Sequence, residues 1–220
     1  MPEIPIHHQA VPALAPARLV DAFAGVVTPH LSDNLDRMAG ITALRRCHRG
    51  RKLVGTAFTV KTRPGDNLPI YHALPLLQSG HVLVIDGGGD LANALIGDLI
   101  LTYLLQRGCA GVVIDGVVRD SAAFAQADFP CYARGISHRG PYKNGPGALN
   151  VPVAIAGQVV NPGDIVVGDE DGVVTFPQSD AERLLEAARR SAAKEEAIRA
   201  EILTGRVEQS WLAPFLGKPA

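Results

Sequence analysis

Two stretches of sequence decide the fold of this chain: HVLVID at residues 81–86 and GVVID at residues 111–115. Each is a short apolar run that ends in Ile-Asp, and a glycine follows each of them, so both make an Ile-Asp-Gly end. Because their apolar residues are continuous rather than alternating, both runs are typical of strands buried on both faces of a parallel sheet. The helical pattern at residues 91–106 between them predicts a strand–helix–strand unit. Ligands gather at the carboxyl ends of such strands, so we expect the functional residues there.

The segments on either side of this unit predict an α/β fold with further strands. Residues 53–62 are rich in β-branched side chains and predict a strand, and residues 63–67 predict a turn that leads into a helix. After an expected short helix at residues 121–127, Gly and Pro divide the chain into short strands, a pattern typical of an antiparallel sheet or barrel. These strands are expected at residues 131–136, 151–155, 164–167 and 172–176, with a hairpin turn between the last two.

Helices are also expected near both ends of the chain. Residues 17–27 have helical spacing, and the motif Ser32-Asp33-Asn34 is expected to cap a second short helix that ends at Gly40. Residues 179–182 have the Ser and Glu spacing of a capping box, which predicts the start of a long helix that ends at Gly205.

Composition excludes several classes of partner. The 220 residues are 47% hydrophobic and 20% charged, with a formal net charge of −1. This balance excludes a basic footprint for nucleic acid and a polybasic membrane patch, and no apolar run is long enough to span a membrane. We therefore expect a soluble, cytoplasmic protein with no nucleic-acid or membrane partner. We divide it into an N-terminal arm at residues 1–16, a single domain at residues 17–205 and a C-terminal tail at residues 206–220.

Two features that often mark a site are set aside. The three cysteines, Cys47, Cys109 and Cys131, have no CxxC spacing, so they indicate neither a disulfide framework nor a thiolate zinc site. Gly87-Gly88-Gly89 follows a strand, but it does not match the GxGxxG fingerprint, and no GxxxxGK[ST] motif occurs in the chain. These glycines are expected to let the backbone turn tightly beneath a pocket.

Asp98 has two structural interpretations. If residues 91–105 form one helix, its carboxylate falls on the apolar face, where an unpaired charge is costly. If instead the helix starts afresh at Gly97, Asp98 and Leu99 lie in its first turn, and their N–H groups can bind a carboxylate. We favour the second interpretation, although an aspartate also suits the first turn of any helix.

Arg119 and Asp120 follow the second apolar run by only a few residues. As a surface ion pair they would contribute little to stability. At the carboxyl end of a buried strand, however, an arginine suits bidentate recognition of a carboxylate. An aspartate there suits an oxygen-preferring cation such as Mg²⁺ or Mn²⁺. The pair is therefore a candidate for binding an anionic substrate beside a divalent metal ion.

Glu195 interrupts the apolar stripe of the predicted C-terminal helix. Four apolar residues share its angular position: Leu184, Ala188, Ile198 and Ile202. Either the helix packs loosely at this point, or Glu195 reaches a polar site, for example on a neighbouring subunit. The Gly- and Pro-rich segment at residues 137–145 is either a lid over a site or a plain connector.

Several short motifs together resemble the 4-hydroxy-4-methyl-2-oxoglutarate aldolase family, which is related in fold to the regulator of ribonuclease E activity A. The resemblance extends from about residue 32 to residue 177. The motifs taken together are specific for this family, whereas any one of them alone is a weak signal. The matching segments are residues 65–68, 84–89, 97–99, 111–120, 139–143, 150–153, 161–164 and 168–173. The resemblance implies a layered α/β/β sandwich, similar to swivelling domains, with a βαβ core and a C-terminal helix. It also implies a homotrimer or homohexamer.

The aldolases that this chain resembles are class II pyruvate aldolases, which are carbon–carbon lyases. The resemblance implies that Asp120 holds Mg²⁺ or Mn²⁺ directly and that Asp98 acts through a bound water. Arg119 and the backbone of Gly97-Asp98-Leu99 would hold pyruvate, with Asn67 nearby. The implied reaction is cleavage of a 4-hydroxy-2-oxo acid to pyruvate. Oxaloacetate decarboxylation would follow from the same chemistry, because loss of CO₂ leaves the same enolate.

The resemblance also leaves a second function open. The regulators of this family bind a ribonuclease or helicase surface, and they lack aspartates at the positions that match Asp98 and Asp120. This chain has both, which favours catalysis over regulation. In the aldolases, a glutamate from the C-terminal helix of an adjacent subunit also belongs to the site. Glu195 is the candidate for that role.

Overall fold

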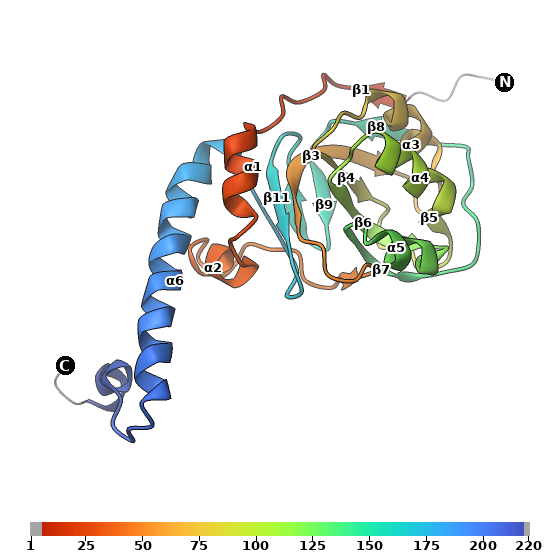
Figure 1. The fold of residues 1–220 in the computed structure, drawn as a ribbon. Coiled ribbons are helices and arrows are strands. Elements are labelled where there is room, and N and C mark those ends of the chain that lie inside the picture. The colour runs from red at the N-terminus through yellow and green to blue at the C-terminus, as the bar shows by residue number, and fades with distance from the viewer. Residues whose placement is uncertain (1–5, 218–220) are drawn as a thin grey trace.

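The computed structural model describes residues 6–217, and within that range ten strands form one large sheet (Figure 1). The sheet order is β1-β8-β3-β4-β6-β7-β2, while β5 pairs with β6 and the β11–β12 hairpin pairs with β3. The strands of this sheet are β1 (Ile6–His8), β2 (Arg45–Arg46), β3 (Leu53–Thr62), β4 (His81–Asp86), β5 (Ala94–Ile96), β6 (Gly111–Val118), β7 (Cys131–Ile136), β8 (Gly147–Leu149), β11 (Ile165–Gly168) and β12 (Val173–Phe176). A separate hairpin consists of β9 (Val153–Ile155) and β10 (Gln158–Val160).

The helices lie between and beyond these strands. The α-helices are α1 (Ala17–Phe23), α2 (Thr28–Asp33), α3 (Leu68–Ala73), α4 (Asp98–Gln106), α5 (Ser121–Ala127) and α6 (Ala181–Leu203). The 3-10 helices are η1 (Leu74–Leu76), η2 (Gln178–Asp180) and η3 (Ser210–Leu216).

The predicted strand–helix–strand unit is confirmed as β4, α4 and β6. Strands β3, β4, β6 and β7 are parallel neighbours, so their carboxyl ends meet at one edge of the sheet. β6 is buried along its whole length and β4 along all but its last residue, as their continuous apolar runs indicate. The register pairs Asp86 with Asp115, which brings the two Ile-Asp-Gly ends side by side.

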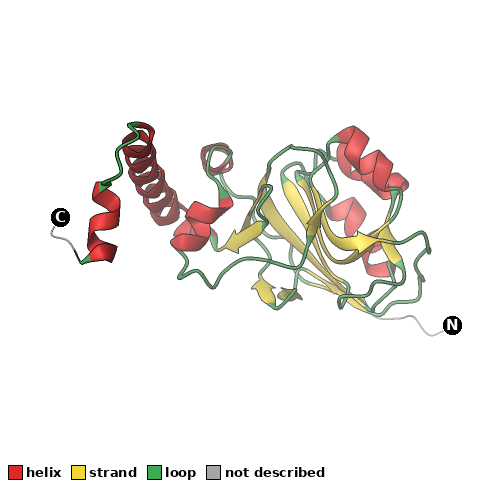
Figure 2. Cartoon of the chain, turned by 90° about the horizontal axis from the view of Figure 1, so that it is seen from below, coloured by secondary structure: helices red, strands yellow, loops and turns green. Residues whose placement is uncertain are grey.

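On the central strands, helices α3, α4 and α5 cover one face and the β9–β10 hairpin covers the other, which confirms the α/β/β sandwich (Figure 2). On the helical face, Ile70 of α3, Leu104 of α4 and Phe124 of α5 belong to one core cluster with the sheet. On the opposite face, Ile155 and Val160 of the β9–β10 hairpin belong to another. The central strands are therefore enclosed from both sides.

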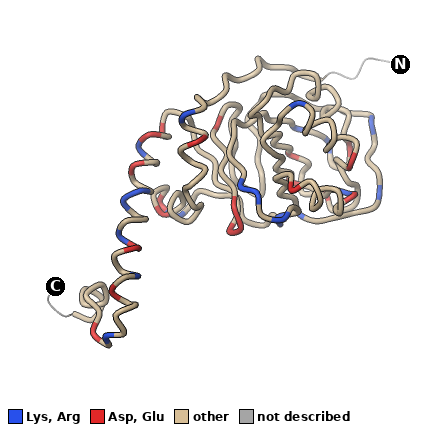
Figure 3. The backbone as a smooth tube through the Cα atoms, in the orientation of Figure 1, with Lys and Arg blue, Asp and Glu red and all other residues tan. Residues whose placement is uncertain are grey.

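Helix α6 is only half packed against the body. A third core cluster joins α1, α2 and the first half of α6 to the β11–β12 hairpin. The buried residues of α6 end at Ala188, and the rest of the helix projects away from the sheet (Figure 1). Acidic and basic residues mix along this projecting part (Figure 3), including the pair Arg199–Glu196. None of the described helices is long and apolar enough to cross a membrane.

The predicted cap of the second helix is wrong. Helix α2 begins at Thr28, ahead of the motif at residues 32–34, and it ends at Asp33. Pro29 explains the early start, because its fixed φ suits the first turn of a helix, where its missing N–H is not needed. Beyond the helix, Asp36 and Arg37 have φ of 58° and 57°, so the helix does not continue to Gly40.

The capping box predicted at residues 179–182 does not form. Residues Gln178–Asp180 make a 3-10 turn, and Asp180, the N-cap residue of α6, makes no side-chain capping bond. Ser179 is therefore inside a turn rather than in the extended conformation that capping requires. The helix itself is confirmed, and it ends at Leu203, two residues before Gly205.

The segment at residues 91–106 is not one helix. Ala94–Ile96 form β5 beside the end of β6, and α4 begins at Asp98 after an extended Gly97. The second interpretation of Asp98 is thus confirmed. The strand at residues 131–136 also departs from the prediction, because it pairs in parallel with β6 rather than within an antiparallel half.

Two buried histidines are expected to make the fold sensitive to acid. The N–H of Gln78 donates to Nδ1 of His81 at 3.0 Å, and the N–H of Cys131 donates to Nδ1 of His48 at 3.0 Å. Burial lowers the pKa of both rings from the usual value. In the unfolded chain these histidines take up protons below about pH 6.5, whereas the folded protein resists protonation. The free energy of unfolding is therefore expected to fall as the pH drops through this range.

Thermal unfolding from about pH 8 down to about pH 5 measures this effect. The variant His81→Gln is expected to have a melting temperature that depends less on pH than that of the natural chain. His72 is exposed, so His72→Gln is the matched control. An unaltered pH dependence in His81→Gln would contradict the assignment.

Candidate functional site

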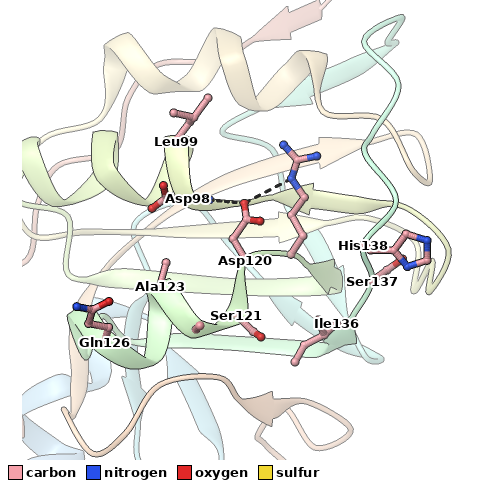
Figure 4. Close-up of a pocket in the computed structure, with 11 residues that line it drawn as sticks. Asp98, Leu99, Asp120, Ser121, Ala123, Gln126, Ile136, Ser137 and His138 are labelled. Carbon is pink, nitrogen blue, oxygen red and sulfur yellow. Dashed lines mark hydrogen bonds and ion pairs between the residues drawn. The ribbon is translucent and has the colours of Figure 1, made fainter.

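The predicted site residues Asp98, Arg119 and Asp120 share one cavity (Figure 4). The cavity has a volume of about 890 Å³ and lies where β6 ends and where α4 and α5 begin. The other residues that line it are Leu99, Ser121, Ala122, Ala123, Gln126, Ile136, Ser137 and His138. The site therefore lies at the carboxyl end of the strand–helix–strand unit, as expected.

Asp120 connects the three predicted residues. The N–H of Asp98 donates to Oδ2 of Asp120 at 2.9 Å (Figure 4), and Nε of Arg119 lies 3.6 Å from the same oxygen. The side chains of Arg119 and Asp120 are 43% and 45% exposed, so this ion pair adds little to stability. Both groups remain open to a ligand in the cavity.

The backbone of Asp120 aims its carboxylate at the start of α4. Asp120 has φ of 53° and ψ of 41°, a left-handed conformation that few residues other than glycine adopt, and it directly precedes α5. Such strained positions persist where the surrounding structure holds them, often at functional sites. The sequence offered no signal for this strain, because aspartate is tolerated in many turns.

Gly97 is required by the close approach of Asp120 and Arg119. A Cβ at position 97 would lie 2.4 Å from Oδ2 of Asp120 and 2.9 Å from Cγ of Arg119. Gly97 has φ of −147°, an extended backbone that any residue can adopt, so the constraint is space rather than conformation. The glycine break in the sequence thus marks the position where two chain segments touch.

A second, smaller cavity of about 40 Å³ adjoins the first and shares Leu99 and Arg119 with it. It includes the predicted residue Asn67, whose Nδ2 donates to the carbonyl of Leu95 at 2.9 Å. Oδ1 of Asn67 is buried and has no hydrogen-bond partner among the described residues. An unsatisfied acceptor of this kind suits a donor on a ligand.

Sequence reasoning missed several residues of these cavities. Tyr71 and Lys143 line the smaller one, and His138 and Gln126 line the larger one. Lys143 and His138 belong to the segment at residues 137–145, which the sequence predicted as a lid or a connector without giving either residue a role. Its Gly and Pro content, and the resemblance carried by residues 139–143, were the signals that could have drawn attention to it.

Asp66 holds this loop against the start of α3. Its carboxylate is fully buried and accepts hydrogen bonds from the N–H groups of Asn144 at 2.7 Å and Leu68 at 2.9 Å. Gly145 also donates its N–H, at 3.1 Å, and the guanidinium of Arg63 lies at 3.0 Å. One carboxylate thus fixes the loop that carries Lys143 and the turn that carries Asn67.

Replacing Asp66 with alanine is expected to lower the free energy of unfolding by about 2–4 kcal/mol. The substitution leaves the buried N–H of Gly145 and the partly buried N–H groups of Asn144 and Leu68 without this acceptor, and unsatisfied groups of this kind are costly. Urea unfolding followed by circular dichroism measures the change. Asp33→Ala, which removes a half-exposed carboxylate paired with Arg37, is the matched control and should cost less than about 1 kcal/mol.

Comparison with known proteins identifies the family. A family model described as "RraA-like: Aldolase/RraA" matches residues 28–175. The chain belongs to the RraA-like family. A relative from Halalkalibacterium halodurans, named "Putative 4-hydroxy-4-methyl-2-oxoglutarate aldolase", is 36% identical over 179 residues, which cover 81% of this chain and 85% of the relative. The resemblance stated from the motifs is confirmed.

Several solved structures are similar to this chain, and their descriptions differ in the function they name. An uncharacterized protein from Pseudomonas syringae pv. tomato has a TM-score of 0.80 and 30% identity, covering 89% of this chain and 92% of its own. Streptomyces coelicolor RraAS2, described as an unusual member of the RNase ES inhibitor RraA protein family, has a TM-score of 0.77 and 28% identity, covering 84% and 96%. The RraA-like family thus contains proteins named as aldolases and proteins named as inhibitors.

The Ile-Asp-Gly aspartates of this RraA-like chain are not among the residues that line the cavity. Asp115 is buried, forms an ion pair with Arg134, and accepts the N–H of Ala156 at 3.1 Å. Asp86 accepts the N–H of Gly88 at 3.1 Å, within its own turn. The strand ends therefore position the site, while the residues after β6 supply its side chains.

Glu195 does not line the cavity that contains Asp98, Arg119 and Asp120. It lies on the projecting part of α6, which Figure 1 places on the far side of the molecule from α4 and α5. Its Oε2 is 3.0 Å from Nε2 of His30, and its side chain is 56% exposed. Ile202, in the same stripe, is 49% exposed, so the stripe continues beyond the part of α6 that packs in this chain. Delivery of Glu195 to a neighbouring subunit stays a prediction.

The residues present can supply only part of a metal site. Among residues 6–217, no group of three or more His, Cys, Asp or Glu side chains is placed to hold a metal ion. Two carboxylates, Asp98 and Asp120, do line the cavity, and Asp98 is exposed. Mg²⁺ is commonly bound through one or two carboxylates, and water and substrate fill its other positions. The donor set therefore fits Mg²⁺ or Mn²⁺ and does not fit a structural zinc ion.

Proposed function

We propose that this chain is a divalent-metal-dependent carbon–carbon lyase that cleaves 4-hydroxy-2-oxo acids, of the 4-hydroxy-4-methyl-2-oxoglutarate type, to pyruvate. The observation that supports this most is the convergence of Asp98, Arg119 and Asp120 in one cavity beside the first turn of a helix. The aldolase names of the relatives agree with it. Oxaloacetate decarboxylation is proposed as a second activity of the same site.

Binding of the substrate begins at its 1-carboxylate. Arg119 supplies a half-exposed guanidinium, and the N–H of Leu99 in the first turn of α4 needs an acceptor from outside the helix. The helix dipole adds positive potential at the same point. Together these groups orient the 2-oxo acid with its reacting carbons toward the larger cavity.

Cleavage breaks the bond between C3 and C4. Its electron pair stays on the pyruvate fragment as an enolate, and the C4 hydroxyl loses its proton as it becomes a carbonyl. Asp98, whose carboxylate is exposed, accepts this proton through a bound water and by the same route can return it to C3 of the enolate. Arg119 stabilises the negative charge that develops on the enolate, and protonation at C3 then yields pyruvate.

Mg²⁺ or Mn²⁺ fits this scheme at Asp120. Oδ1 of Asp120 makes no hydrogen bond within the described chain, so it is available to hold the ion, with Asp98 acting through water. A bound ion of this kind supplies Lewis-acid stabilisation of the 2-oxo oxygen. We further propose a homotrimer or homohexamer in which Glu195 of a neighbouring copy reaches the site, and a cytoplasmic location.

A second candidate function is a non-catalytic regulator that binds a ribonuclease. It is favoured by the apolar side chains around the cavity, since Leu99 is 80% exposed and Ile136 is 62% exposed. Exposed apolar side chains that lie together often mark protein-binding surfaces. The two cavity carboxylates favour the lyase, because a protein-binding surface has no need of a metal site.

The test is release of pyruvate by the purified protein, coupled to lactate dehydrogenase. With Mg²⁺ or Mn²⁺ present, we expect turnover of a 4-hydroxy-2-oxo acid that a chelator abolishes and added metal restores. No pyruvate from any of several 4-hydroxy-2-oxo acids or from oxaloacetate would overturn the proposal and leave the regulator as the better explanation.

A further inference from the structure

Cys47 and Cys131 face each other across the last two strands at one edge of the sheet. The antiparallel register of β2 and β7 pairs Arg45 with Ala133 and Arg46 with Tyr132, so the next pair is Cys47 with Cys131. The N–H of Cys47 donates to the carbonyl of Cys131 at 2.8 Å. The N–H of Cys131 donates to Nδ1 of His48 instead, so the pair makes one of the two bonds of a hydrogen-bonded pair. Residues directly opposed in antiparallel strands have Cα atoms about 4.5–5.5 Å apart, within the range that disulfides span.

The two side chains also point to the same side of the sheet. Cys131 is a member of the core cluster beneath the helices, and Cys47 packs against that cluster. Both cysteines are free thiols, and Sγ of Cys47 donates a hydrogen bond to the carbonyl of Arg45 at 3.6 Å. A disulfide here requires little movement of the backbone.

The two thiols differ in reactivity. Cys47 is half-buried, and its contact with Cys131, together with the nearby Arg45, lowers its pKa. Burial raises the pKa of Cys131 well above the usual value and raises that of Cys109 to about 11. The thiolate is the nucleophile in thiol–disulfide exchange. Cys47 is therefore expected to react with an external disulfide before Cys131 or Cys109 does.

We propose that Cys47 and Cys131 form a reversible dithiol site that reacts with low-molecular-weight disulfides of the oxidised glutathione type. Cys47 gives its proton to water and attacks one glutathione sulfur. The glutathione disulfide bond breaks, and one glutathione leaves and takes up a proton. Cys131 then loses its proton and attacks the sulfur of Cys47, and the second glutathione leaves. Two thiols are oxidised and one external disulfide is reduced to two thiols.

The opposed positions of Cys47 and Cys131, on the same side of the sheet, support the second step. The raised pKa of Cys131 slows it, but a nucleophile held beside its target reacts far faster than one in solution. The product closes a long loop between residues 47 and 131, which restricts the unfolded chain. The oxidised protein is therefore expected to melt on the order of 10 °C above the reduced one.

The full chain is incubated in glutathione buffers with an increasing oxidised fraction. Its free thiols are then alkylated, and its mass is measured by mass spectrometry. We expect the oxidised chain to be two hydrogens lighter than the reduced chain before alkylation and to take up one alkyl group, on Cys109, where the reduced chain takes up three. The variant Cys109→Ala should behave identically. In Cys131→Ala, which lacks the second thiol, a glutathione adduct should accumulate on Cys47. In Cys47→Ser no disulfide should form within the chain.

Three results would overturn the proposal. One is a natural chain that stays fully reduced in every buffer. Another is a glutathione adduct that persists on Cys47 in the natural chain, because Cys131 then fails to displace it. A third is a disulfide between two chains on a non-reducing gel in place of one within the chain. If Cys131→Ala does not fold, the comparison of the natural chain with Cys47→Ser decides the question alone.

Discussion

Replacing Asp120 with asparagine is expected to lower kcat/KM for pyruvate release by about a hundred- to a thousandfold. The amide has nearly the shape of the carboxylate, so it can still accept the N–H of Asp98 and keep the start of α4 in place. It lacks the negative charge that would attract a divalent cation and that faces Arg119. The substitution should therefore lower kcat/KM while leaving the stability of the fold nearly unchanged.

Three measurements separate the effects of Asp120→Asn on catalysis, on metal binding and on stability. Pyruvate release is followed at several Mn²⁺ concentrations, Mn²⁺ affinity is measured by titration calorimetry, and the melting temperature is compared with that of the natural chain. Asp21→Asn, an exposed aspartate on α1, is the matched control and should change none of them. Unchanged turnover in Asp120→Asn would refute the role of this carboxylate as a metal ligand.

Replacing Gly97 with alanine is expected to lower kcat/KM by about a hundredfold or more, although no charged or polar side chain is removed. The added Cβ would lie within 2.4 Å of Oδ2 of Asp120 and within 3.0 Å of Nε of Arg119. These distances are too short, so both side chains must move away. A displacement of about 1 Å in a catalytic group can cost about a hundredfold in rate.

The matched control is Gly25→Ala. No heavy atom lies within 4 Å of a Cβ placed at Gly25, so this variant should retain full activity. Gly97→Ala is expected to stay folded with a cost of about 1–3 kcal/mol, because the crowded side chains are half-exposed and have room to shift. Full activity in Gly97→Ala would show that Arg119 and Asp120 need not hold their observed positions.

The sequence predicted the central part of the fold because that part depends on local patterns. Continuous apolar runs marked β4 and β6, and the glycine break marked the start of α4 at Asp98. The two predicted helix caps were wrong, at residues 32–34 and 179–182, for a related reason. The capping motifs were present, but Pro29 and the 3-10 turn at Gln178–Asp180 set the helix starts instead.

By itself, the sequence determined the two buried strands of the strand–helix–strand unit and the polar residues at its glycine break and its end: Asp98, Arg119 and Asp120. Only the tertiary structure decided that Asp120 turns back to the N–H of Asp98, that Asp66 holds the loop at Asn144, and that Cys47 lies opposite Cys131. The physical reason is sequence separation. Periodicity reports which face of an element is buried, whereas these contacts join residues 22 to 84 positions apart, and chain folding alone brings them together.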